Sequence, residues 1–258
     1  MQYLSVAEAR DLTGLRLVLS AHVPGPWGES AKAVFKARGV GFRPVEQKIL
    51  EPNEELVAWT GSRNAPIAML DADPPVSNWL DQLMLAERIG TGPSLLPEAP
   101  LDRALSIGIS AEICAPGGFG WSRRLVMFQG LYGPGDVSPA APAHVLHMCR
   151  QYGYSGAAAE AATGRMVAIM GMLADRLHLQ RAAGSDYLVG DRLGACDLYW
   201  ACFSNMIAPL PLEDAPMPPA LHERYADAGS EVAAALDPIL IAHRDMIYRR
   251  HIGLPLEF

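Results

Sequence analysis

Hydrophobic positions in the first ninety residues alternate between short continuous runs and helical spacing. A short apolar run bounded by turn residues is typical of a buried strand, whereas apolar residues three and four apart are typical of an amphipathic helix. The predicted strands are residues 15–21, 40–47, 67–70 and the pair 75–76. The predicted helices are residues 27–38, 49–59 and a segment that begins at Ser77. This alternation predicts a small α/β domain over residues 1–90.

The segment from Asn64 to Ile89 combines several features of a ligand site. Ala65 and Pro66 form a turn that enters a strand, and a proline is tolerated there because the first residue of a strand need not donate to the ladder. We expect a cis peptide bond at this turn. Ser77 is the predicted N-cap of the following helix, whose first amides offer hydrogen-bond donors and positive potential to an anion.

Helical spacing dominates the rest of the chain. Residues 91–100 are rich in glycine and proline and are the predicted linker. The predicted helices beyond it are residues 101–114, 121–129, 143–152, 155–183, 194–208, 220–226 and 231–251. The Gly117–Gly120 stretch is a predicted helix break rather than a phosphate loop, because no strand precedes it. The pattern therefore predicts an all-helical second domain over residues 101–258.

Composition and charge exclude several classes of function. The net charge is −7 and no Lys/Arg cluster is longer than a pair, which argues against nucleic-acid binding. No run approaches the roughly 20 apolar residues of a membrane span. The four cysteines lack Cys-x-x-Cys spacing and the N-terminus lacks a secretory signal, so we predict a cytoplasmic protein. His144, His147 and Cys149 have no second cluster to complete a tetrahedral set, and we predict no metal site.

Several stretches match, in order, the motifs of one known family. They are Gly25–Val40, Ala65-Pro66, Val76-Ser77 with Leu80 and Leu83-Met84, Leu95–Pro97 with Arg103, and Tyr187–Asp197. These resemble, in turn, the first helix, the cis-proline turn, the Glu-Ser-x-x-Ile element, the interdomain passage and the helix-capping element of the glutathione S-transferase superfamily. The resemblance covers nearly the whole chain.

This resemblance implies a thioredoxin-like N-terminal domain, a C-terminal helical bundle and a homodimer. It also implies glutathione as cosubstrate and a hydrophobic small molecule as second substrate. Ala65 would pair through its main chain with the cysteinyl part of glutathione, and Ser77 would hold the γ-glutamyl carboxylate. The residues implied to contact glutathione are Pro26, Ala65, Pro66, Val76 and Ser77, and those implied for the second-substrate pocket are Trp121 and Arg124.

The chain departs from the family pattern at two site positions. Gly25 stands where the family has Cys, Ser or Tyr, so a mixed disulfide cannot form there. Stabilisation of a thiolate is left to amides near Trp27 and Gly28, or to a displaced hydroxyl on Ser20 or Ser30. Val76 replaces the acid that precedes the family's serine. Two classes therefore stay open: a glutathione transferase or related lyase, and a non-catalytic binding or protein-association module of the same fold.

The second half of the chain carries three further expectations. Gly194 is the predicted N-cap of a core helix, and Asp197 is placed to reach back to it. Cys196 and Cys202 lie on the same helix and are predicted core thiols. His243 and His251 lie in an arginine-rich helical segment and are predicted at the surface or at an interface.

Overall fold

The computed structural model describes residues 1–49 and 51–258, which divide into two compact units. Unit 1 comprises Met1–Leu95, Pro211–Met217 and Arg249–Phe258, and unit 2 comprises Leu96–Leu210 and Pro218–Tyr248. Two segments from the C-terminal part of the chain thus belong to unit 1. The amide of Leu256 donates to the carbonyl of Asp214 at 2.7 Å and ties these two segments together.

Unit 1 is built on a sheet with the strand order β2-β1-β3. Strand β1 (Leu15–Ser20) pairs in parallel with β2 (Arg43–Gln47) and antiparallel with β3 (Ile67–Leu70). Strand β1 is central and its apolar residues are buried on both faces, which explains its continuous apolar run. The strand predicted at residues 75–76 is a single bridge, in which Val76 exchanges hydrogen bonds of 2.8 and 2.9 Å with Ala68.

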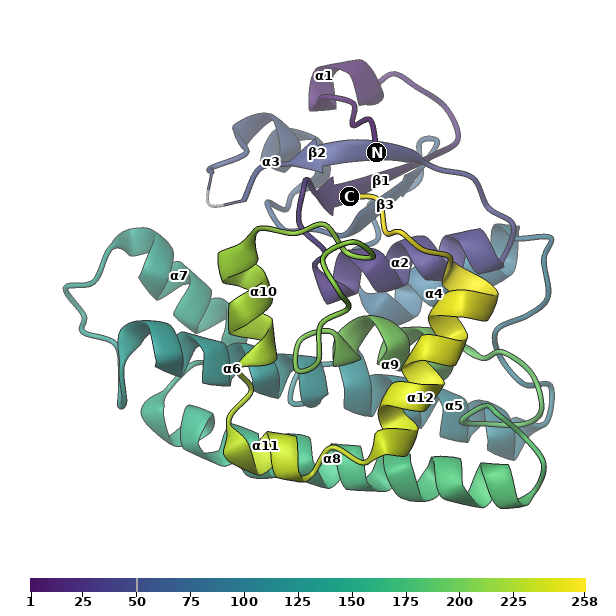
Figure 1. Ribbon diagram of the computed structural model, residues 1–258. Helices are drawn as coiled ribbons and strands as arrows, with labels where there is room; N and C mark the ends of the chain where they lie inside the picture. Colours follow the sequence, from purple (N-terminus) through teal and green to yellow (C-terminus); the bar gives the residue numbers. More distant parts are fainter. Residues whose placement is uncertain (50) are drawn as a thin grey trace. The chain divides into compact units, whose positions relative to one another are not determined.

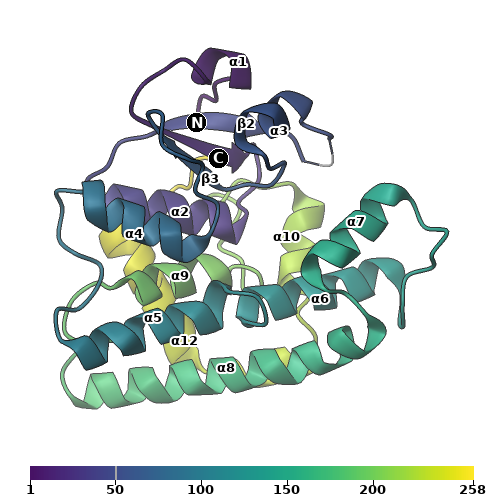
Figure 2. The same cartoon turned by 180° about the vertical axis from the view of Figure 1, so that it is seen from behind.

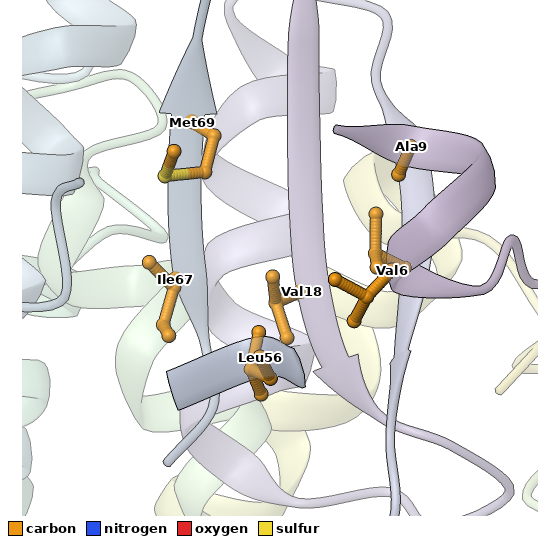
Figure 3. Packing of buried hydrophobic residues seen from close by; sticks show 7 residues of the cluster. Val6, Ala9, Val18, Leu56, Ile67 and Met69 are labelled. Carbon is orange, nitrogen blue, oxygen red and sulfur yellow. The ribbon is translucent and has the colours of Figure 1, made fainter. Parts of the chain in front are cut away.

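Four helices cover the two faces of this sheet (Figures 1 and 2). They are α1 (Val6–Ala9), α2 (Pro26–Ala37), α3 (Glu54–Thr60) and α4 (Trp79–Ile89). Helices α1 and α3 lie on one face, and α2 and α4 on the other. Figure 3 shows Val18 of β1 between Ile67 of β3 and Val6 of α1 in this core, with Leu56 of α3 beside Val18. Helix α1 was not predicted, because four residues are too few to show a period; a reciprocal capping box between Ser5 and Glu8 stabilises it.

Unit 2 is helical. Its helices are α5 (Pro100–Cys114), α6 (Phe119–Tyr132), α7 (Ala143–Tyr152), α8 (Gly156–Ala182), α9 (Ala195–Ser204), α10 (Pro219–Ala226), α11 (Ser230–Ala234) and α12 (Pro238–Ile247), followed by a π-helical turn at Tyr248–Ile252 that runs into unit 1. Every residue of α9 is buried, as expected for a helix that is apolar all round. The predicted fold class, an α/β N-terminal part followed by helices, is confirmed. None of the helices in the described part of the chain is long and apolar enough to cross a membrane.

Two predictions for the C-terminal helices are wrong. The single helix expected over residues 231–251 is broken, because Pro238 has no amide hydrogen for the ladder and instead begins α12. Asp237 caps this new helix by accepting from the amide of Ile239 at 2.9 Å. His243 is fully buried rather than at the surface. It lies on the face of α12 that packs against α9. The polar residues that neighbour it along the chain did not indicate this burial.

The predicted cap of α9 is confirmed. Gly194 is its N-cap, and the carboxylate of Asp197 accepts from the Gly194 amide at 2.8 Å. Cys196 and Cys202 are buried in the core, as predicted.

Candidate functional site

The entrance to strand β3 has main-chain groups that form no hydrogen bond with any other described residue. The peptide bond between Ala65 and Pro66 is cis, as predicted. Pro66 is buried and Ala65 is half-buried, packed against the core under α1 and α3. Among the described residues, neither the N–H nor the C=O of Ala65 has a hydrogen-bond partner. An unpaired donor and acceptor at the end of an edge strand can pair with an extended peptide.

Gln82 holds this entrance against helix α4. Its side-chain amide donates to the carbonyls of Pro66 at 3.1 Å and Val76 at 3.0 Å, and the residue is only 3% exposed. Sequence reasoning missed this residue. The available signal was a polar residue next to Leu83 on the apolar face of an amphipathic helix, where only a bonded amide is tolerated.

Helix α4 begins one residue later than predicted. Asn78, not Ser77, is its N-cap, and the Asn78 side chain accepts from the amide of Leu80 at 2.9 Å. Both residue types are preferred caps, so the local sequence did not separate them. Ser77 is exposed just before the helix, and its hydroxyl has no hydrogen bond within the described part of the chain. It lies in the positive potential of the helix start.

Helix α2 begins at Pro26, with Gly25 as its N-cap. The first intrahelical bond runs from the amide of Glu29 to the carbonyl of Gly25 at 2.9 Å, so the amide of Gly28 precedes it. Gly25 has no side chain to accept from the first amides. A Cβ atom placed at Gly25 would meet no heavy atom within 4 Å, so packing does not require glycine there.

The two hydroxyls considered for thiolate stabilisation already donate within unit 1. Ser30 is 2% exposed and its Oγ donates to the carbonyl of Trp27 at 3.0 Å. The Oγ of Ser20 donates to Oε1 of Gln47 at 2.7 Å. Trp27 itself is half-buried in the first turn of α2. The main-chain amides at the start of α2 are therefore the donors best placed for an anion.

A buried ion pair joins the first turn of α2 to the second. Nζ of Lys32 lies 2.7 Å from the carboxylate of Glu29 and also donates to the carbonyl of Glu257 at 2.6 Å. Burial raises the pKa of Glu29, and Lys32 opposes that rise. Burial, with Glu29 and Glu46 nearby, raises the pKa of Tyr3 to about 12. The first turn of α2 thus contains a buried carboxyl group, that of Glu29.

Trp121 and Arg124 lie together on α6, against α7. The indole Nε1 of Trp121 donates to the carbonyl of Tyr152 at 2.8 Å, and the two rings are 4.7 Å apart. The guanidinium of Arg124 lies 5.9 Å from the centre of the same tyrosine ring. The predicted pair therefore shares one aromatic partner, Tyr152.

The described residues contain no group of three His, Cys, Asp or Glu side chains that could hold a metal ion. The described residues form no disulfide, and all four cysteines are buried. Burial raises the pKa of the Cys114 and Cys196 thiols well above the ordinary value, so these thiols stay protonated at neutral pH.

Comparison with solved structures identifies the fold. No protein-family model and no curated protein matches the sequence. A glutathione S-transferase domain-containing protein of Marinobacter aquaeolei superposes with a TM-score of 0.61 at 12% identity, over 92% of this chain and 100% of that one.

Two further solved structures with a similar fold are a glutathione S-transferase complex and a beta-etherase. A glutathione S-transferase of Methylobacterium radiotolerans in complex with glutathione sulfonate has a TM-score of 0.53 at 17% identity, over 87% of this chain and 95% of its own. The beta-etherase LigF of Sphingobium has a TM-score of 0.56 at 15% identity, over 86% of this chain and 98% of its own. At these identities the comparison shows the fold.

Proposed function

We propose that this chain, which has the glutathione S-transferase fold, binds glutathione on unit 1 and transfers it to, or uses it to cleave, a hydrophobic electrophile. The observation that carries the proposal is the unpaired main chain of Ala65 beside Pro66. A bound glutathione analogue in the Methylobacterium neighbour and the etherase name of the Sphingobium neighbour support it.

In this proposal, two features of unit 1 hold glutathione. Its cysteinyl amide and carbonyl pair with the C=O and N–H of Ala65, as a short added strand. Its γ-glutamyl carboxylate meets the start of α4, where Ser77 supplies a hydroxyl donor and the helix supplies positive potential. Pro66 and Val76 form the wall between these contacts, held by Gln82. Pro26 bounds the site at the start of α2.

The thiol of glutathione then lies at the start of helix α2. The amides of Trp27 and Gly28 stabilise the thiolate, as oriented dipoles do at helix N-termini, and lower the thiol pKa. The proton leaves to solvent, and the thiolate sulfur forms a bond to carbon while a leaving group departs or a double bond accepts the electron pair. Gly25 contributes an N-cap without a side chain.

The second candidate function is a non-catalytic binding module. Gly25 and Val76 favour it, because neither supplies the side chain that the family pattern places at the sulfur and before the serine. In this case glutathione binds at the same position on unit 1 and its thiol keeps an ordinary pKa.

Calorimetric titration with glutathione, alongside a conjugation assay with 1-chloro-2,4-dinitrobenzene, separates the two. Binding with turnover supports the enzyme, and binding without turnover supports the module. The placement at Ala65 is tested with glutathione methylated on the cysteinyl amide nitrogen, which cannot donate to the Ala65 carbonyl. We expect its affinity to fall by about tenfold, the cost of one hydrogen bond of ~1.4 kcal/mol. Equal affinity for both ligands would place glutathione elsewhere.

We further propose a homodimer, by analogy with the family pattern. Sedimentation velocity at micromolar concentration tests this directly, since a single species at the monomer mass of 27.8 kDa would contradict it.

A further inference from the structure

Arg123 is a buried cation in unit 2, and no carboxylate of the described residues is bonded to it. It is 1% exposed, and its Nε donates to the carbonyl of Met206 at 2.8 Å. Its Nη2 donates to the carbonyls of Arg224 at 2.7 Å and Asp227 at 2.8 Å. Within the described part of the chain, its Nη1 has no hydrogen-bond partner and no acidic side chain forms a salt bridge with it.

A cleft of about 740 Å³ adjoins this guanidinium, between α6, α8 and the segment that joins α10 to α11. Its apolar wall comes from Val126, Met127 and Leu131 of α6. Gly130, on the same helix, and Thr163 of α8 also line it. Trp121 and Arg124, expected to line the second-substrate pocket, are not among the lining residues.

The electrostatics of the cleft favour an anion at its floor. Desolvation lowers the pKa of Arg123 to about 10, which still leaves the group charged at neutral pH. Among the described residues, only carbonyl groups accept hydrogen bonds from the guanidinium, and the Asp227 carboxylate acts on it through space without a bond, so a ligand anion on Nη1 would recover part of the desolvation penalty. Asp227 and Glu231 also line the cleft, but they are exposed, as is Arg224, and water screens exposed charges much more than buried ones.

We propose that this cleft binds a small amphipathic carboxylate, with the carboxylate on Nη1 of Arg123 and the apolar part against Val126, Met127 and Leu131. The residues of this site all belong to unit 2, and the proposal does not rest on the proposed glutathione binding by unit 1. A bidentate contact is not required, because one free Nη1 donor and a desolvated positive charge are sufficient for a charge-assisted hydrogen bond.

The test uses the full chain and three ten-carbon probes that differ in head group: decanoate, decanol and decyltrimethylammonium. Calorimetric titration is expected to show decanoate binding at least about tenfold more tightly than decanol, since a hydrogen bond to a charged group contributes roughly 1.5–3 kcal/mol. The ammonium probe should bind more weakly than both. Equal affinities for decanoate and decanol would overturn the assignment of Arg123.

Position in the cleft is tested with Gly130→Trp, because a Cβ at Gly130 meets nothing within 4 Å and the indole would fill the space beside Leu131. Gly171→Trp is the matched control: Gly171 is an exposed glycine within α8 that has the same open surroundings and does not line the cleft. We expect decanoate affinity to fall at least about tenfold in Gly130→Trp and to stay unchanged in Gly171→Trp.

Arg123→Lys, whose ammonium cannot keep all the carbonyl contacts, is examined only if circular dichroism shows a native fold. Unchanged decanoate affinity in Gly130→Trp would overturn the site whatever Arg123→Lys shows. A chain that binds none of the three probes would overturn it as well.

Discussion

Nε2 of His243 on α12 lies 2.9 Å from Oδ1 of Asp197 on α9, and both side chains are buried. The same carboxylate accepts from the amides of Leu188 and Gly194, each at 2.8 Å. One buried acid therefore joins the cap of α9, the loop before it and a helix more than forty residues away. Its three bonds compensate for the cost of burying the charge.

Removing this carboxylate should destabilise the protein strongly. Asp197→Ala leaves two buried amides and an imidazole without their acceptor, and we expect the free energy of unfolding to fall by about 3–5 kcal/mol. Urea denaturation followed by circular dichroism measures it. Asp73→Ala is the control, because Asp73 and its ion-pair partner Arg88 are both exposed, and it should cost less than about 1 kcal/mol. Similar losses in the two variants would contradict the role of Asp197.

A thiol placed at Gly25 should ionise more easily than one at the other end of α2. In Gly25→Cys the sulfur lies at the helix N-terminus, where the pKa of a thiol falls below its ordinary value of roughly 8.5. In Lys36→Cys the sulfur lies in the last turn, where the helix dipole disfavours an anion. The rate of iodoacetamide alkylation against pH reports both values, with the buried native thiols as background. Equal pKa values would argue against thiolate stabilisation by α2.

Gln82→Ala should weaken both the fold and glutathione binding. The carbonyls of Pro66 and Val76 lose a buried donor, at a cost of about 1–3 kcal/mol in the free energy of unfolding. Gln180→Ala is a matched control, since Gln180 bridges the carbonyls of Tyr187 and Gly190 in the same way within unit 2. Calorimetry should show reduced glutathione affinity in Gln82→Ala alone. Reduced affinity in both variants would indicate a general loss of folding.

Substitutions at Ser77 and Asn78 should have different effects, one on glutathione binding and the other on the stability of helix α4. Asn78→Ala removes the acceptor of the Leu80 amide and should cost about 1 kcal/mol of stability. Ser77→Ala should leave stability within about 0.5 kcal/mol and lower glutathione affinity, because its exposed hydroxyl is proposed to meet the γ-glutamyl carboxylate. Thermal unfolding and glutathione titration of both variants test this. If Ser77→Ala binds as the wild type does, Ser77 is not a contact.

The buried acid Glu29 should make stability depend on pH. Its pKa is raised in the folded state by burial, so the neutral form is favoured on folding. The stability that this provides is complete below the ordinary value of 4.5 and is lost as the pH rises through the folded-state pKa. Glu29→Gln cannot ionise, so its stability relative to the wild type should increase as the pH rises above 4.5. Urea unfolding between about pH 4 and pH 8 measures it, and a constant difference would contradict the raised pKa.

Local spacing in the sequence determined several features of both units. The central strand, the start of α2 at Pro26, the cis turn at Pro66 and the cap at Gly194 all depend on residues a few positions apart. Steric and hydrogen-bonding preferences of a short segment are sufficient for such features. The same reasoning placed the candidate site at Ala65 and Pro66.

Only the tertiary structure decided which polar residues are buried and what they bond. Gln82 is 16 residues from the carbonyl of Pro66, His243 is 46 from Asp197, and Arg123 is 101 from the carbonyl of Arg224. No periodicity within one segment encodes such pairs, because the burial of a polar side chain is tolerated only when a distant partner arrives with it. The local sequence therefore determined the central strand, the start of α2 and the cap of α9, and packing determined which polar side chains hold the elements together.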